Sequence, residues 1–164
     1  MTELLIMRHA KSAWDTAETD FNRPLNSRGE RAAAQMANWL ADNDLAPDRI
    51  VSSAAVRTHD TAVAVMFACG VDRTKVDFEH DLYLASAGAW FDVMQKQTCS
   101  RLLICGHNPG LDDLVDALSA DDPPLSSSGK LMTTAAIAHL SFEAAWPEIT
   151  LRSGHLLSLT RPRR

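Results

Sequence analysis

Short, continuous runs of apolar residues alternate along the chain with stretches in which apolar residues recur at helical spacing. Residues 4–7 and 102–105 are apolar throughout, which is typical of strands buried on both faces of a parallel sheet. Residues 49–52 form a shorter run of the same kind. The pattern predicts three buried strands with helical segments between them.

The first two helical stretches carry recognisable end signals. Ser27 and Glu30 stand at the spacing of a capping box, so a helix is predicted to start at Ser27 and to end before Pro47. A second helix should follow residue 53 and end at Gly70, since glycine readily adopts the backbone that closes a helix. The side chains expected to face the core from this second helix are Val56, Val63, Met66 and Phe67.

Two more helices and two more strands complete the prediction. Residues 85–96 suit a third helix, and a fourth has one apolar face made of Leu111, Leu114, Val115 and Leu118. Residues 133–142 and 148–159 resemble two strands joined by a turn. Strands that alternate with helices indicate an α/β fold, here three-layer α/β/α, with a mostly parallel central sheet and an antiparallel C-terminal strand element. With no linker or repeat in sight, 1–164 is expected to be a single domain.

Composition narrows the class of partner. The net charge of −5 leaves no basic stripe for a nucleic acid, and the only basic cluster, Arg161, Arg163 and Arg164, is interpreted as a solvated tail. Three cysteines without a paired spacing indicate a reducing compartment. Neither a secretory signal nor a membrane span is visible, so we expect a cytoplasmic protein with no membrane partner.

The candidate chemistry lies where the strands end. Arg8 and His9 follow the first apolar run, Gly106 and His107 follow the second, and Arg57 starts the helix after the third. In open parallel sheets ligands bind at the carboxyl ends of strands, so His9 and His107 should meet if their strands are neighbours.

This set of side chains suits a phosphoryl group. Arginine forks bind phosphate oxygens in pairs, a neutral imidazole such as that of His9 can attack phosphorus, and a protonated one such as that of His107 can stabilise the charge. The spacing of histidines and carboxylates matches no zinc motif, so the pattern gives no support to a metal site. The other histidines are interpreted as structural.

Four ordered segments resemble the histidine phosphatase superfamily, and in particular its small bacterial branch typified by the phosphohistidine phosphatase SixA. They are Arg8-His9 after the first strand, residues 20–29, residues 52–62 around Arg57, and residues 106–111 around His107. The resemblance implies that His9 is the nucleophile and that Arg8, Arg57 and His107 form the phosphate pocket. It also implies that the protein uses no metal and no cofactor. Asn108 and Arg23 are further candidates for substrate contact.

One departure from the family pattern concerns the proton donor. Many members place a Glu in the segment that corresponds to residues 79–90, where this chain offers only Glu79 and Asp81 as candidate acids, and we count Asp81 among the candidate substrate-binding residues. An alkoxide leaving group needs an acid, whereas an imidazole can itself be protonated near neutral pH. A site poor in acids favours a phosphoramidate substrate.

Three functions stay open on the sequence. The first is a phosphatase that removes phosphate from phosphohistidine in a protein, a histidine phosphotransfer domain for example. The second is a small-molecule phosphomonoesterase or phosphoglycerate-mutase-like enzyme, which would act on a small phosphorylated metabolite. The third is a non-catalytic phosphate-binding domain. The presence of all four pocket residues, Arg8, His9, Arg57 and His107, argues against it.

Overall fold

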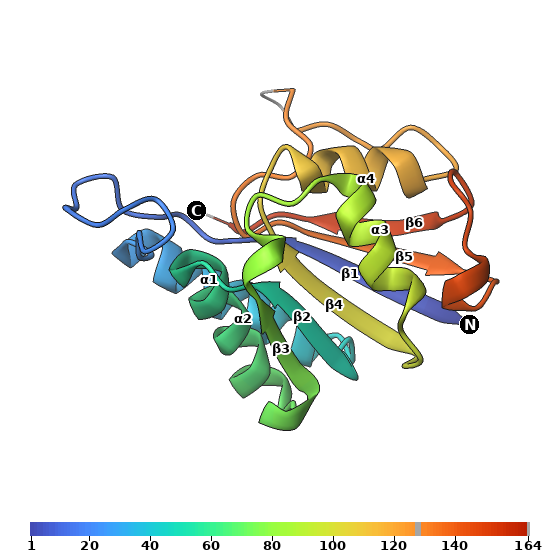
Figure 1. Ribbon diagram of the computed structural model, residues 1–164, viewed down its shortest axis with the longest axis horizontal. Helices are drawn as coiled ribbons and strands as arrows, with labels where there is room; N and C mark the ends of the chain where they lie inside the picture. The colour runs from blue at the N-terminus through green and yellow to red at the C-terminus, as the bar shows by residue number, and fades with distance from the viewer. Residues whose placement is uncertain (127–128, 164) are drawn as a thin grey trace.

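A computed structural model describes residues 1–126 and 129–163 of the protein, and these form one twisted six-stranded sheet (Figure 1). Its strands are β1 (Thr2–Arg8), β2 (Arg49–Ser53), β3 (Val76–Glu79), β4 (Arg101–Gly106), β5 (Ile137–Phe142) and β6 (His155–Thr160). The order across the sheet is β3-β2-β4-β1-β5-β6, with β1 to β4 parallel and the C-terminal pair antiparallel. The mostly parallel sheet with an antiparallel C-terminal element is confirmed, and β3 is a strand that the sequence pattern did not predict.

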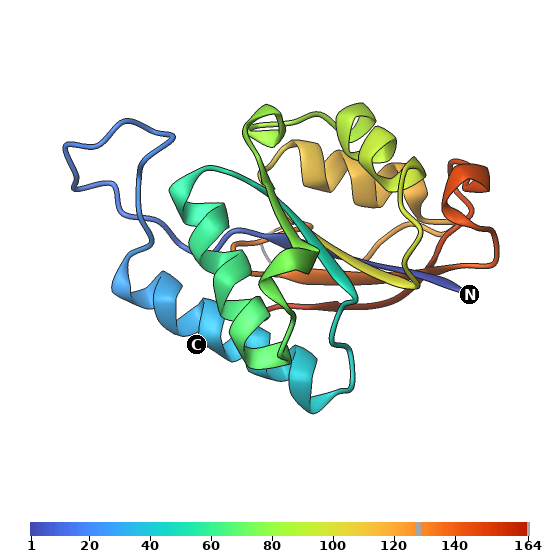
Figure 2. The same cartoon turned by 60° about the horizontal axis from the view of Figure 1, so that its bottom comes forward.

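Helices cover both faces of the sheet. The longer helices are α1 (Ser27–Asp42), α2 (Val56–Cys69), α3 (Ala87–Gln95) and α4 (Gly110–Leu118), and three short 3-10 turns are η1 (Arg73–Lys75), η2 (His80–Leu82) and η3 (Trp146–Glu148). Figure 2 shows α1 and α2 on one face and α3 and α4 on the other. The predicted three-layer arrangement is therefore confirmed. None of the helices within the described residues has the length and apolar character needed to cross a bilayer.

Alternation along the central strand β1 divides the core in two. Leu4 and Ile6 belong to the cluster under α3 and α4, whereas Leu5 and Met7 belong to the cluster under α1 and α2. All four side chains are fully buried. Because both faces of β1 are covered, a continuous apolar run is what the strand requires.

Helix α1 starts at Ser27 as predicted, but the residue that caps it differs from the predicted capping box. Asn26, not Ser27, is the N-cap, because its side-chain oxygen accepts a hydrogen bond from the Gly29 N–H at 2.8 Å. Gly29 is required at this point, since a Cβ atom there would lie 1.9 Å from the carbonyl oxygen of Lys11. The close approach fixes the N-terminus of α1 against the chain that follows β1.

The buried face of α2 is also different from the one predicted. Phe67 is 77% exposed, and Val56, Val63 and Met66 are only partly buried. The residues of α2 that are buried are Arg57, Thr58, Thr61, Ala62 and Val65. Gly70 does end the helix in a left-handed conformation (φ 66°), as predicted. The polar residues on the buried face lie at the ends of β1, β2 and β4, and they support the site described next.

Between β1 and α1 the chain forms a long segment that projects beyond the sheet (Figure 1). A bridge between Ser12 and Leu25 closes its base, and the Ala13 N–H donates to the Pro24 carbonyl at 2.8 Å. This segment, residues 13–24, carries side chains back toward the ends of the parallel strands.

Candidate active site

The strand order brings three strand ends together. β4 lies between β1 and β2, and its register places Gly106 beside Arg8. The residues that follow, His9 and His107, therefore meet at the carboxyl edge of the sheet, with ring centroids 5.4 Å apart and ring planes at 53°. The expectation that these two histidines are neighbours is confirmed.

His9 has a defined tautomer. Its Nδ1 lies 2.7 Å from the carbonyl oxygen of Ala10, and a carbonyl can only accept, so Nδ1 carries the proton and Nε2 has the free lone pair. Burial lowers the pKa of His9 to about 3, with the positive charge of Arg8 adding to the effect and the Ala10 hydrogen bond opposing it. The ring is neutral at physiological pH. The Ala10 N–H in turn donates to Thr61 at 3.0 Å, which ties this turn to α2.

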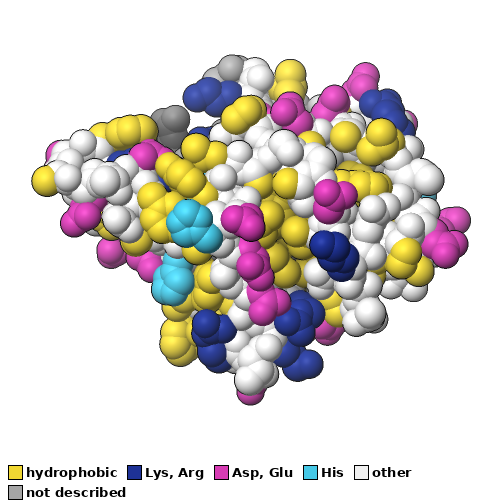
Figure 3. Space-filling model, in the orientation of Figure 1, with side chains coloured by type: hydrophobic (Ala, Val, Ile, Leu, Met, Phe, Trp, Pro, Cys, Tyr) yellow, Lys and Arg dark blue, Asp and Glu magenta, His cyan; other side chains and the backbone are white. Residues whose placement is uncertain are grey.

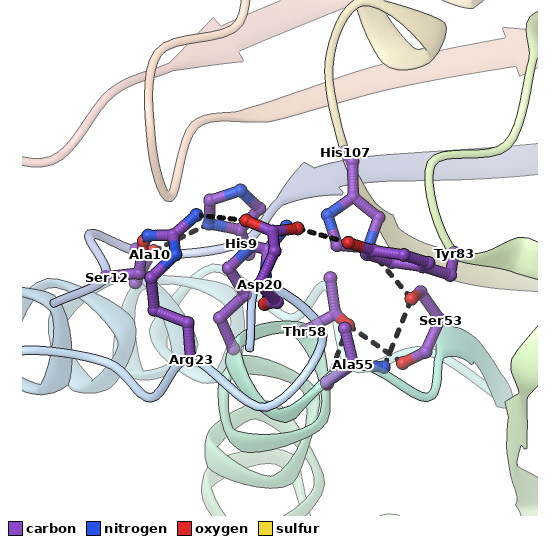
Figure 4. Close-up of polar contacts among 11 residues, drawn as sticks. His9, Ala10, Ser12, Asp20, Arg23, Ser53, Ala55, Thr58, Tyr83 and His107 are labelled. Atoms are coloured by element: carbon purple, nitrogen blue, oxygen red, sulfur yellow. Dashed lines mark hydrogen bonds and ion pairs between the residues drawn. The ribbon is translucent and has the colours of Figure 1, made fainter. Parts of the chain in front are cut away.

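His107 is held from the β2 side. Its Nε2 lies 2.8 Å from the hydroxyl oxygen of Ser53, and its Nδ1 is buried with no partner among the described residues. Figure 4 shows Nδ1 on the side of the ring that faces His9. Burial and the charge of Arg57 lower the pKa of His107 to about 4. Against protein groups alone the ring is neutral.

Arginine side chains from three segments surround the two rings. Arg8 donates from Nη1 to the Met132 carbonyl at 3.1 Å, and Arg57 and Arg23 are almost fully buried. The Nε atoms of all three arginines are buried without a hydrogen-bond partner in the described part of the chain. Buried donors are rarely left unpaired, so this concentration of positive N–H groups indicates an anion-binding site.

Asp20 connects the projecting segment to this cluster (Figure 4). Its carboxylate accepts from Arg57 at 3.0 Å, from Arg23 at 3.1 Å and from the hydroxyl of Tyr83. The Tyr83 hydrogen bond and the two arginines hold the pKa of Asp20 well below its usual range. Asp20 is therefore an ionised brace for the arginines, and it is a poor proton donor.

These side chains line a cavity of about 240 Å³. Its lining consists of Arg8, His9, Lys11, Ser12, Trp14, Arg23, Arg57, Leu84, His107, Asn108 and Thr134. No Asp or Glu of residues 1–126 or 129–163 is among them. The cavity thus combines a neutral nucleophile with several cationic donors, which is an arrangement able to bind a tetrahedral oxyanion and to attack it.

The remaining predicted residues separate into two groups. Arg23 and Asn108 line the cavity, but the side chain of Asn108 is also used to brace backbone, donating to the Met132 carbonyl at 2.9 Å and accepting from the Asp112 N–H at 3.1 Å. Asp81 and Glu79 are exposed and are not brought to the cavity lining. Neither carboxylate is placed to donate a proton there.

Three residues that support the cavity were missed from the sequence. Asp20 and Tyr83 form the carboxylate and hydroxyl brace of Arg57, and Ser53 fixes His107. The spacing of Asp20 three residues before Arg23 is a signal for a local ion pair. No sequence signal marked Tyr83, because it reaches Asp20 from a turn far along the chain.

A metal centre finds no support in the donor set. Within the described ranges, no three His, Cys, Asp or Glu side chains converge as a metal site would require. The absence of a metal stays a prediction of the sequence. The cationic lining of the cavity favours this prediction, because arginines beside the ligand position repel a cation.

Comparison with known proteins places this arrangement among related ones. The family model for the histidine phosphatase superfamily (branch 1) matches residues 4–108. An uncharacterised chloroplast protein of Arabidopsis thaliana is 30% identical over 162 residues, which is 92% of this chain and 72% of that protein. The phosphohistidine phosphatase SixA of Escherichia coli is 26% identical over 146 residues, 86% of each chain. A solved structure of the protein histidine phosphatase SixA with tungstate superposes with a TM-score of 0.81 at 25% identity, covering 98% of this chain and 97% of that one.

Proposed function

The chain belongs to the histidine phosphatase superfamily, and from that premise we propose that it removes the phosphoryl group from phosphohistidine in a protein. It does so as a single domain, since both halves of the core pack on one sheet. The phosphohistidine phosphatase SixA of Escherichia coli and the solved structure of a protein histidine phosphatase SixA support this substrate class. Tungstate, which is bound in one of them, is a tetrahedral oxyanion like phosphate.

His9 is the nucleophile in this proposal. Nε2 attacks phosphorus in line, the bond from phosphorus to the substrate imidazole breaks, and a phospho-His9 intermediate forms. The Ala10 carbonyl keeps the proton on Nδ1, so the phosphorylated ring is cationic and leaves readily when water attacks. The products are inorganic phosphate and neutral His9.

Arg8, Arg57 and Arg23 hold the phosphoryl oxygens. Their Nε groups have no partner among the described residues, and Asp20 fixes the planes of two of the three guanidinium groups in advance. Nε2 of His107 shares a hydrogen bond with the Ser53 hydroxyl, which leaves Nδ1 as the ring nitrogen that faces the reacting group. A dianion arriving beside His107 would also raise its pKa and favour a cationic ring.

The carboxylate-free lining is the observation that carries the choice of substrate. The carboxylate that contacts the arginines of the site, Asp20, is bound to these cations and to Tyr83 and stays ionised. A phosphorylated imidazole that is protonated on its free nitrogen leaves as a neutral ring and takes no proton from the enzyme. A sugar alkoxide would need the acid that this cavity lacks. The rim side chains Trp14 and Leu84, which are 80% and 56% exposed, also suit contact with a protein.

The test compares leaving groups. We expect kcat/KM at pH 7.5 for a chemically phosphorylated histidine phosphotransfer domain to exceed that for glucose 6-phosphate by at least about a hundredfold. His9→Ala should abolish both turnover and the phosphoenzyme trapped by rapid alkaline quenching. His155→Ala, an exposed histidine on β6, is the matched control. Faster turnover of the sugar phosphate, or a phosphoenzyme in His9→Ala, would contradict the proposal.

A further inference from the structure

A second and larger cavity opens beside the catalytic one. It measures about 740 Å³ against about 240 Å³, and Lys11 and Thr134 line both, so the two cavities are adjacent. We call this larger cavity the basic groove. Its lining consists of Lys11, Arg28, Arg31, Ala32, Gln35, Ser126, Thr133, Thr134, Arg161, Pro162 and Arg163.

Five cationic side chains and no carboxylate line the basic groove within the described residues. All of the ion pairs found in residues 1–126 and 129–163 involve other basic residues, so Lys11, Arg28, Arg31 and Arg163 have no acidic partner there. The chain as a whole carries a net charge of −5. On the face seen in Figure 3, Lys and Arg side chains lie among Asp and Glu side chains. The basic groove thus reverses the general charge of the molecule.

The position of two of these arginines is unfavourable for folding. Arg28 and Arg31 lie in the first two turns of α1, next to the positive end of the helix dipole. Both are exposed, and neither forms an ion pair with a carboxylate of the described residues, although Glu30 lies in the same turn as Arg28. Such a placement is accounted for if the charges serve a ligand.

The C-terminal residues of the groove are held in place. Arg161 donates from Nη2 to the Leu131 carbonyl at 2.9 Å and to the Lys130 carbonyl at 3.3 Å. With the amide nitrogen and oxygen of Gln35 assigned so that each has a hydrogen-bond partner, the side chain donates to the Arg163 carbonyl at 3.2 Å and accepts from the Arg163 N–H at 3.0 Å. The interpretation of this cluster as a solvated tail is therefore wrong for Arg161, whereas the Arg163 side chain is exposed and only its backbone is bound, and Arg164 lies outside the described residues.

We propose that the basic groove binds acidic side chains of the phosphoprotein substrate that lie beside its phosphorylated histidine. The inference rests on the proposed function and refines its substrate class. A single phosphoryl group fits the smaller cavity, whereas a groove three times as large has room for several Asp or Glu side chains. Because Lys11 lines both cavities, carboxylates in the groove would lie next to the reacting group, and complementary charge favours both encounter and register.

The experiment uses three synthetic phosphohistidine peptides of equal length, with acidic, neutral or basic residues flanking the phosphorylated histidine. At low ionic strength the acidic peptide should have a kcat/KM about tenfold above the neutral one, carried by KM, and salt at about 0.5 M should remove the difference. Arg28→Ala/Arg31→Ala should bring the ratio close to one, and Arg28→Glu/Arg31→Glu should invert it in favour of the basic peptide.

The control variant Lys75→Ala/Lys96→Ala removes two exposed cations outside the groove and should keep the wild-type ratio. If none of the peptides is hydrolysed, the proposed function fails. If all three are hydrolysed with equal kcat/KM, the function stands and the docking proposal is overturned. Binding of tripolyphosphate to the groove, together with equal kcat/KM for the three peptides, would also overturn the docking proposal and would indicate that the groove binds a small polyanion.

Discussion

Asp20 accepts two hydrogen bonds from Arg57, one from Nη1 on its backbone oxygen at 2.5 Å and one from Nη2 on its carboxylate at 3.0 Å. Both terminal nitrogens of the guanidinium are thereby fixed, while Nε stays without a partner among the described residues. Because Asp20 also binds Arg23 and Tyr83, the projecting segment determines how the phosphate donors are oriented.

The first prediction concerns this brace. Asp20→Asn keeps the size of the side chain and removes its charge, so Arg57 and Arg23 lose a charge-assisted partner. We expect kcat/KM for a phosphohistidine protein to fall by about tenfold or more, which corresponds to about 1.5–3 kcal/mol for hydrogen bonds to a charged group. Asp15→Asn, an exposed carboxylate of the same segment, serves as the control in steady-state kinetics. Equal activity of the two variants would argue against a role for Asp20.

The second prediction concerns Ser53, a positioning residue for His107. Ser53→Ala removes the partner of Nε2, so the ring is free to adopt the other tautomer. We expect kcat to fall by about tenfold with KM nearly unchanged, because the lost interaction acts in the transition state. The pH profile of kcat should shift as well, and Ser53→Thr should recover part of the rate. A merely structural role for the hydroxyl would lower thermal stability without moving the pH profile.

The third prediction follows from the lowered pKa values of His9 (about 3) and His107 (about 4). In the unfolded chain both rings titrate near about 6.5, so below that pH the unfolded state binds protons that the folded state does not. Stability should be full above pH 6.5 and should fall toward pH 4, with a slope that approaches about 1.4 kcal/mol per pH unit for each ring. Asp20 adds a loss in the same direction at lower pH.

Urea unfolding between pH 7.5 and 4 measures this dependence. His107→Gln should reduce the slope of unfolding free energy against pH by the contribution of one imidazole ring. His155→Gln, which removes an exposed histidine, should leave the slope as in the wild type. Parallel curves for wild type and His107→Gln would show that His107 is not held neutral by the fold.

The fourth prediction concerns the glycine that precedes His107. A Cβ atom at Gly106 would lie 2.7 Å from Cζ2 of the fully buried Trp90, so Gly106→Ala forces the indole or the strand to move. We expect a loss of about 1–3 kcal/mol in the free energy of unfolding, together with lower activity, because His107 is the next residue. Gly88→Ala, where the nearest atom is 3.8 Å away, should be neutral or slightly stabilising in α3. Thermal unfolding distinguishes the two variants.

The parts of the fold that could be predicted from sequence are those in which burial determines residue type. The runs that became β1 and β4 are buried on both faces, and α4 shows its apolar face directly. The buried face of α2 was predicted wrongly because it includes Arg57, Thr58 and Thr61. These residues are polar because they support the site, so an apolar pattern does not mark this face. β3 was missed because it is a short edge strand with only its first residue buried.

The candidate site divides in a similar way. His9 and His107 stand directly after strands, so their meeting follows from the sheet alone once β1 and β4 are neighbours. The contact between Tyr83 and Asp20 depends on where a turn and a projecting segment meet in space, and no local pattern records that. The basic groove was missed for the same reason, since it joins α1 to residues near the end of the sequence.

The position of β1 in the sheet also bears on how the protein is made. Both of its neighbours, β4 and β5, are encoded far downstream, so on the ribosome the apolar β1 has to wait for most of the chain before it can pair. Such non-local pairing slows folding and leaves an aggregation-prone strand unpaired during synthesis. His9 and His107 come together only when β4 inserts between β1 and β2, so the nascent chain gains its nucleophilic site late and in one step.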